Sequence, residues 1–183
     1  MHVALPKSRG TEKLPPSEQP LGFIAAGCDA TLGYVGGYLL TTARGRPLEF
    51  HYTTPVKPSA THRILYGGEL EPYIYDTLIG ASLLQHSTIE PALVVTDQPL
   101  LLCHRPRLTY PLVSVMSGPA HASAEDAGAV PEFKTHPEFA PDRDAVARWI
   151  STVNAGLNLA EPFARIWEAI RQAMGAEAKQ VAA

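Results

Sequence analysis

The sequence of 183 residues has only two cysteines, Cys28 and Cys103, and neither belongs to a Cys-x-x-Cys or a Cys/His spacing. It therefore favours neither a disulfide framework nor a structural zinc site. Long hydrophobic runs are missing too. The most apolar stretch, residues 21–41, contains Asp29 and five glycines, which is typical of strands and turns rather than of a membrane helix.

An excess of positive charge is also absent. The chain carries 15 Lys and Arg against 18 Asp and Glu, which gives a formal net charge of −3 and a pI near 6.1. This balance disfavours a nucleic-acid coat or a polybasic membrane binder, because both depend on summed positive charge. The N-terminus lacks the apolar core of a secretory signal. We expect a cytoplasmic protein with no membrane partner.

Apolar residues make up 45% of the chain and charged residues 18%, which predicts a folded domain. Changes in composition divide the chain into five parts. These are a flexible Pro-rich arm (1–19), an α/β core (20–116), a long loop (117–141), C-terminal helices (142–174) and a frayed tail (175–183).

Hydrophobic periodicity predicts the elements within these parts. Short apolar or alternating segments predict strands at 21–26, 34–42, 48–53, 92–97 and 110–116, the first three forming an antiparallel meander. Ser59 or Thr61 is expected to cap a short helical turn before Gly67. Pro72 opens a longer helix, because proline suits the first turn of a helix. Further helices are expected at 98–105, 142–153 and 162–174. The resulting order, β-β-β-α-β-α-β followed by helices, predicts an α/β fold with a mixed sheet.

This order resembles the ribonuclease H-like superfamily over about residues 22–116. The family places an acid at the end of the first strand, a Glu at the first long helix, an Asp after the fourth strand and a fourth acid in a C-terminal helix. The matching residues here are Asp29, Glu71, Asp97 and either Asp142 or Asp144. The resemblance implies that these carboxylates are catalytic ligands of Mg²⁺ or Mn²⁺ in a nuclease or related phosphoryl-transfer domain, where two ions about 4 Å apart activate water and stabilise the leaving oxygen.

Each acid also has a structural interpretation. Asp29 can shape a turn, Glu71 can complement a helix N-terminus, and Asp97 can cap the helix that follows it. Asp142 and Asp144 both suit the first turn of a helix. The sequence leaves these alternatives open.

Three functional hypotheses follow. The first is a divalent-metal-dependent nuclease acting on nucleic acid, although residues 20–115 hold six positive and seven negative side chains and no basic run. The second is a non-catalytic interaction subunit of the same fold, which would bind a protein partner through the C-terminal helix. It is favoured by Asp29-Ala-Thr, where the family has Asp-Gly-Ser. The third, a small-molecule binding domain, requires an apolar pocket.

Overall fold

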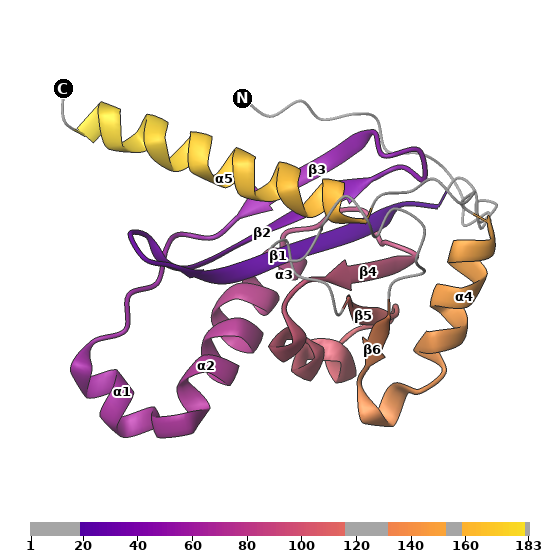
Figure 1. Cartoon of the computed structure of the whole chain (residues 1–183), viewed down its shortest axis with the longest axis horizontal. Helices are drawn as coiled ribbons and strands as arrows, with labels where there is room; N and C mark the ends of the chain where they lie inside the picture. Colours follow the sequence, from indigo (N-terminus) through magenta and orange to yellow (C-terminus); the bar gives the residue numbers. More distant parts are fainter. Residues whose placement is uncertain (1–18, 116–131, 153–158, 182–183) are drawn as a thin grey trace.

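The computed structural model describes residues 19–115, 132–152 and 159–181, with side chains undescribed at 151–152 and 176–181. Residues 1–18 of the predicted arm (1–19) and most of the predicted loop (117–141) therefore lie outside the described residues. Within the described residues the protein has a six-stranded mixed sheet with helices on both faces (Figure 1).

The first three strands form the predicted antiparallel meander. They are β1 (Leu21–Asp29), β2 (Gly33–Thr41) and β3 (Pro47–Tyr52). The turn between β1 and β2 needs a glycine at position 33, because its φ of 91° is in the left-handed region that other residues avoid.

A helical excursion follows β3 and returns the chain to the sheet. The short helix α1 (Ala60–Tyr66) is capped by Ser59, which is one of the two caps that the sequence predicted. After the turn η2 (Gly67–Glu69), the segments α2 (Leu70–Tyr73), η3 (Ile74–Ala81) and α3 (Ser82–Gln85) form the expected longer helix, with Pro72 in its first turn. The strand β4 (Leu93–Thr96) then pairs in parallel with β1.

The remaining elements complete the sheet and one of its covering layers. The helix η4 (Pro99–Arg107) leads to β5 (Leu112–Val115), which is parallel to β4. The strand β6 (Phe133–Thr135) pairs antiparallel with β5, and η5 (Pro137–Phe139) follows. The last helices are α4 (Asp142–Thr152) and α5 (Ala160–Val181).

Several boundaries differ from the sequence expectations by one to three residues, and two differences are larger. Residues 133–135 form β6 inside the segment expected to be a loop, because three residues are too few to show a periodic pattern and the pairing partner is distant in sequence. The helix α5 continues to Val181, past the expected end at Met174. The alanines and lysine after Gly175 are good helix formers, which explains the extension.

The strand order is β3-β2-β1-β4-β5-β6, and an apolar cluster covers each face of the sheet. On one face, α4 and α5 pack against Phe23, Ala25 and Val95. On the other face, η3, α3 and η4 pack against Ile24 and Val94. This mixed α/β arrangement is consistent with a ribonuclease H-like fold, as predicted. Among the described residues no helix is long and apolar enough to cross a membrane.

Candidate functional site

Asp97 lies where the resemblance predicts an acid, directly after β4. Its backbone N–H donates to the carbonyl of Ile24, and its carboxylate accepts from the N–H of Ala26 at 3.1 Å. The side chain lies on the α5 face and accepts a hydrogen bond from Trp167. Burial raises the pKa of the Asp97 carboxyl to about 6, against the lowering effect of these hydrogen bonds.

Asp29 ends β1 and is exposed. Its carboxylate accepts from the backbone N–H groups of Thr31 and Leu32 at 2.7 and 2.8 Å, and these bonds lower the pKa of Asp29 below its ordinary value. This is the turn-shaping role of the structural interpretation. Because Asp97 bonds Ala26, and Asp29 lies three residues further along β1, the two positions are about 10 Å apart along the strand.

Glu71 approaches the sheet from its other face. It is exposed in the first turn of α2, and its Oε1 accepts from the hydroxyl of Tyr34 at 2.8 Å. This hydrogen bond and partial burial raise the pKa of Tyr34 to about 12. Tyr34 belongs to the apolar cluster under η3, whereas Trp167, the partner of Asp97, lies on the α5 face. The sheet therefore separates Glu71 from Asp97.

The two candidates for the fourth acid have different environments. Asp142 is buried and forms a two-pronged ion pair with Arg105, at 2.5 Å from Nε and 3.0 Å from Nη2. It also accepts from the N–H of Leu112, at the amino end of β5. Since β4 and β5 are parallel, Asp142 lies at the opposite end of the sheet from Asp97. Asp144 is exposed in the first turn of α4.

This arrangement does not fit a shared two-ion site. Two ions about 4 Å apart need carboxylates that converge on one point, and here the acids occupy two faces and two ends of the sheet. Among the described residues, no group of three or more His, Cys, Asp or Glu side chains could hold a metal ion. Binding of Mg²⁺ or Mn²⁺ thus stays a prediction without support from the geometry.

A pair that sequence reasoning missed lies on the helical layer. His104 Nδ1 in η4 is 2.7 Å from Asp76 Oδ1 in η3, although 28 residues separate them. The nearest sequence signal was the neighbour pair Cys103 and His104, which cannot act together because adjacent helical side chains diverge. A single sequence carries no signal that joins residues 76 and 104.

Comparisons with known proteins give only a weak, fold-level resemblance. No protein-family model matches the chain, and no curated protein is significantly similar to it. A solved structure that resembles it is the endonuclease V of Ciona intestinalis in complex with a 23mer DNA that contains an inosine followed by a ribo-adenosine. The identity is 13% and the TM-score 0.31, over 54% of this chain and 45% of that chain. The chain thus spans less than half of the endonuclease, and no functional conclusion follows from the likeness.

Proposed function

We propose that this chain is an interaction subunit with a ribonuclease H-like fold, and that it binds a second copy of itself through the surface of α1. The separation of Asp29, Glu71 and Asp97 supports a binding role over metal-dependent cleavage. The observation that carries the proposal is the complete exposure of α1, a helix that contains apolar side chains.

The helix α1 contributes nothing to the core of its own chain. None of its seven residues is buried, and Ile64 and Leu65 are 81% and 73% exposed. Burying one such side chain at an interface would stabilise a complex by about 1.5–3 kcal/mol. A helix this short is marginal in water unless its apolar side chains pack against something. A partner surface would supply that packing.

Local hydrogen bonds define both ends of α1, although none of its side chains packs in the core. The hydroxyl of Ser59 accepts from the N–H of His62, and His62 Nδ1 accepts from the N–H of Ser59, so the two residues form a reciprocal cap. At the other end, Gly67 has a φ of 51° and donates its N–H to the carbonyl of Arg63. These caps define where the helix begins and ends.

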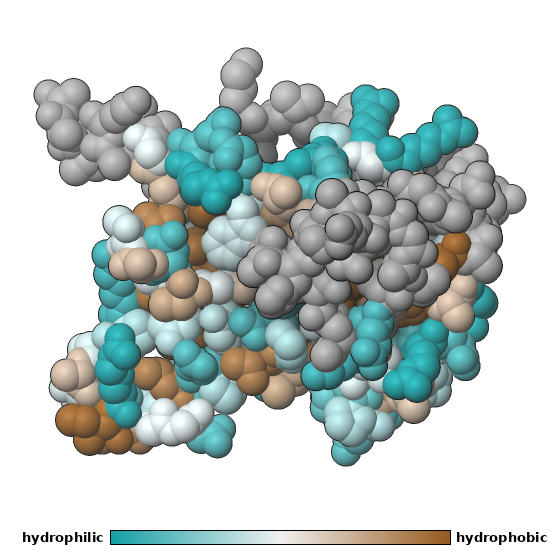
Figure 2. Space-filling view, in the orientation of Figure 1, coloured by the Kyte–Doolittle hydropathy of each residue, from teal (hydrophilic) through white to brown (hydrophobic). Residues whose placement is uncertain are grey.

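Two aromatic residues extend the exposed apolar area. The rings of Tyr66 and Tyr73 are in contact at a tilt of 33° with their centroids 4.9 Å apart, and both residues are more than a third exposed. Together with Ile64 and Leu65 they form what we name the α1 surface. Figure 2 shows hydrophobic residues at the lower left, where Figure 1 places α1. Exposed apolar and aromatic groups gathered in this way are typical of protein interfaces.

The charges beside the α1 surface favour a second copy as the partner. Arg63 and Glu69 are both exposed and carry opposite charges within one short segment. In a two-fold symmetric contact the same surface meets itself, so Arg63 of one copy can face Glu69 of the other. A surface with one sign of charge would repel its own copy, whereas a surface with both signs can pair with itself.

Sedimentation over a concentration series tests the proposal. We expect a concentration-dependent dimer that is lost in the double variant Ile64→Glu and Leu65→Glu, because the new charges would be desolvated at the contact. The matched control is Ile89→Glu, since Ile89 is also exposed (38%) but belongs to the segment between α3 and β4. Circular dichroism should show that all three proteins are folded. A wild type that stays monomeric up to millimolar concentration overturns the proposal.

A charge reversal distinguishes this contact from other modes of association. Arg63→Glu and Glu69→Arg should each weaken the dimer, and the double reversal should restore it. A dimer that is insensitive to both single changes would place the contact elsewhere on the chain and contradict the α1 surface.

The nuclease hypothesis is tested separately with Mg²⁺ and Mn²⁺. An ion that binds only the folded state raises the midpoint of thermal unfolding. We expect no specific rise in the wild type relative to Asp97→Asn, and no metal-dependent cleavage of RNA, DNA or hybrid substrates. Cleavage that Asp97→Asn abolishes would overturn the non-catalytic interpretation.

A further inference from the structure

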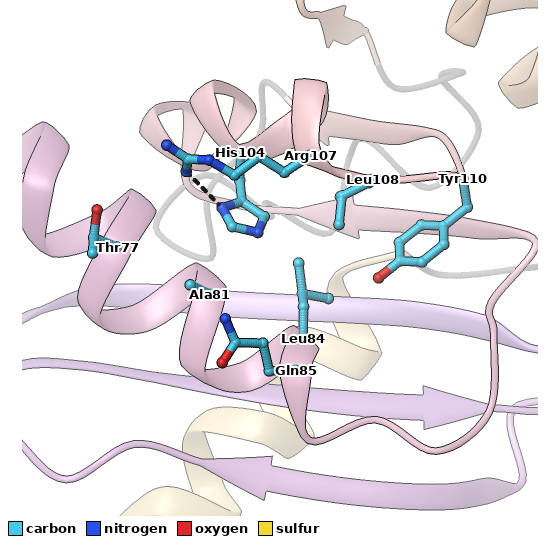
Figure 3. Close-up of a pocket in the computed structure, with 8 residues that line it drawn as sticks. All are labelled: Thr77, Ala81, Leu84, Gln85, His104, Arg107, Leu108 and Tyr110. Carbon is cyan, nitrogen blue, oxygen red and sulfur yellow. Dashed lines mark hydrogen bonds between the residues drawn. The ribbon is translucent and has the colours of Figure 1, made fainter.

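A cavity of about 360 Å³ opens between the helical layer and the start of β5, and its lining includes no residue of α1 and none of the five acids considered above. Its walls come from η3, α3, η4 and the segment before β5 (Figure 3). The apolar part consists of Ala81, Leu84 and Leu108, and the polar part includes Gln85, His104 and Tyr110. An apolar cavity with a few convergent polar groups is the usual form of a small-molecule site.

The histidine of this cavity is held by a carboxylate. His104 is 6% exposed, and its Nδ1 lies 2.7 Å from Oδ1 of Asp76. Because an ionised carboxylate can only accept hydrogen bonds, Nδ1 carries the proton and donates it. In the neutral ring, Nε2 is then an acceptor with a free lone pair. Asp76 thus fixes both the tautomer and the direction of the ring.

Arg107 is the third member of a polar cluster that also contains His104 and Asp76. Its Nη1 donates to both carboxylate oxygens of Asp76, at 2.7 and 2.6 Å, and lies 3.2 Å from His104 Nδ1, the pair joined by the dashed line in Figure 3. With the proton on Nδ1, these two nitrogens are donors that share the carboxylate of Asp76 as their acceptor. The guanidinium offsets the charge of the carboxylate, so the three side chains together add no net negative charge to the cavity.

The other ring nitrogen of His104 faces the cavity. In Figure 3, Nε2 points away from Arg107 and toward Leu84 and Leu108, and the hydroxyl of Tyr110 points toward the same space from the far side. Among the described residues, none forms a hydrogen bond with Nε2. The ring is buried except on its cavity side, so Nε2 is an acceptor that water or a ligand in the cavity can use.

We propose that this cavity binds a small single-ring compound with a hydroxyl or N–H group, such as a phenol. The donor of the ligand bonds Nε2 of His104, and its ring packs against Leu84 and Leu108. The volume is at the lower end of the range for ligand pockets, which limits the ligand to about one ring with short substituents. The site is independent of the α1 surface, so either proposal can fail without the other.

The test compares phenol with anisole, which has the same ring but no O–H donor. The protein carries ¹⁵N in its histidine rings, and long-range ¹H–¹⁵N spectra report the state of each nitrogen. Without a probe, the spectrum of His104 should show the proton on Nδ1. Phenol should shift the Nε2 resonance of His104 in a saturable way, and anisole should bind at least about ten-fold more weakly, which corresponds to one lost hydrogen bond.

Two variants complete the design. Ala81→Met fills the cavity from its wall and leaves His104 and Asp76 in place, so it should weaken phenol binding by about ten-fold or more. His86→Gln is the control, because His86 is exposed and does not line the cavity, and it should bind phenol as the wild type does.

Three results would overturn the proposal. The first is equal binding of phenol and anisole, because Nε2 would then not be the acceptor. The second is binding that Ala81→Met leaves unchanged, which would place the probe elsewhere. The third is the absence of any shift at millimolar phenol in the folded wild type.

Discussion

The carboxylate of Asp97 accepts a hydrogen bond from the backbone N–H of Ala26, 3.1 Å away, across the parallel pair formed by β1 and β4. The contact places an acid at the carboxyl end of β4 next to a position of β1 that carries no acid. The nearest acid of β1, Asp29, is three residues further on and bonds its own turn. Asp97 therefore stands alone, and burial raises the pKa of its carboxyl to about 6.

The raised pKa of Asp97 predicts a specific dependence of stability on pH. The folded protein holds this proton more tightly than the unfolded chain, whose carboxyl has an ordinary pKa near 3.8. The stabilisation is therefore complete below about pH 4 and is lost as the pH rises through about 6. Asp97→Asn removes the ionisation, so at pH 7 the variant should be more stable than the wild type by about 1–3 kcal/mol.

Urea unfolding of both proteins between pH 4 and pH 8 measures this difference. Other carboxylates titrate in the same range, but they do so in both proteins and cancel in the comparison. The advantage of Asp97→Asn should shrink as the pH falls toward 4. A difference that stays constant over this range would mean that the Asp97 carboxyl has the same pKa in the folded and unfolded states.

The ion pair between Asp142 and Arg105 predicts a structural role for Asp142. Both side chains are buried, and Arg105 also lies over the ring of Phe139 with 4.1 Å to the centroid. Asp142→Asn leaves a buried guanidinium without its counter-charge, which should lower the free energy of unfolding by about 3–5 kcal/mol. Asp144→Asn, the control two residues away, should leave it essentially unchanged because Asp144 is exposed. Chemical denaturation checks both, and equal effects would contradict this assignment.

The order of the elements could be predicted from the sequence because each one has a local signal. Pro72 marks the start of a helix, and the alternation around Phe50 marks a strand. Burial was harder to predict. Phe50 and its neighbours Leu48 and Tyr52 are more than a third exposed, because β3 is the outermost strand of the sheet. The alternation gives the two faces of a strand but not how far the covering layer extends over them.

The geometry of the candidate site could not be predicted because it depends on register and on distant contacts. Nothing in the local sequence sets the pairing of Ile24 with Thr96, which places Asp97 level with Ala25, four residues short of Asp29 along β1. The partner of Asp142 lies 37 residues away in sequence. Acids in the expected order along the chain thus end on different faces and at different ends of the sheet.

The caps of α1 predict local rather than global loss of structure when one is removed. Ser59→Ala deletes the hydroxyl that accepts from His62, and none of the residues of α1 is buried. Amide hydrogen exchange in residues 60–66 should become several-fold faster, because losing such a cap costs a helix about 1 kcal/mol. The midpoint of global unfolding should not change. A parallel loss of global stability would show that α1 is coupled to the core.

The helix α5 lies directly against the sheet at Gly37, which predicts that this position tolerates no side chain. A Cβ at Gly37 would lie 2.6 Å from Cγ2 of Ile166 and 3.1 Å from Cδ1 of Ile170, both fully buried. Gly37→Ala should therefore lift α5 from the sheet and lower the free energy of unfolding by about 1–3 kcal/mol. Gly68→Ala is the matched control, since a Cβ there has no atom within 4 Å.

Denaturant unfolding gives the stability of both glycine variants. Tryptophan fluorescence reports how α5 packs on the sheet, because Trp167 lies on this helix. In Gly37→Ala we expect a fluorescence change under native conditions together with the loss of stability. The absence of both effects would mean that α5 adjusts freely on the sheet. The hydrogen bond from Trp167 to Asp97 would then shift together with the helix, because Trp167 is one of the donors to this carboxylate.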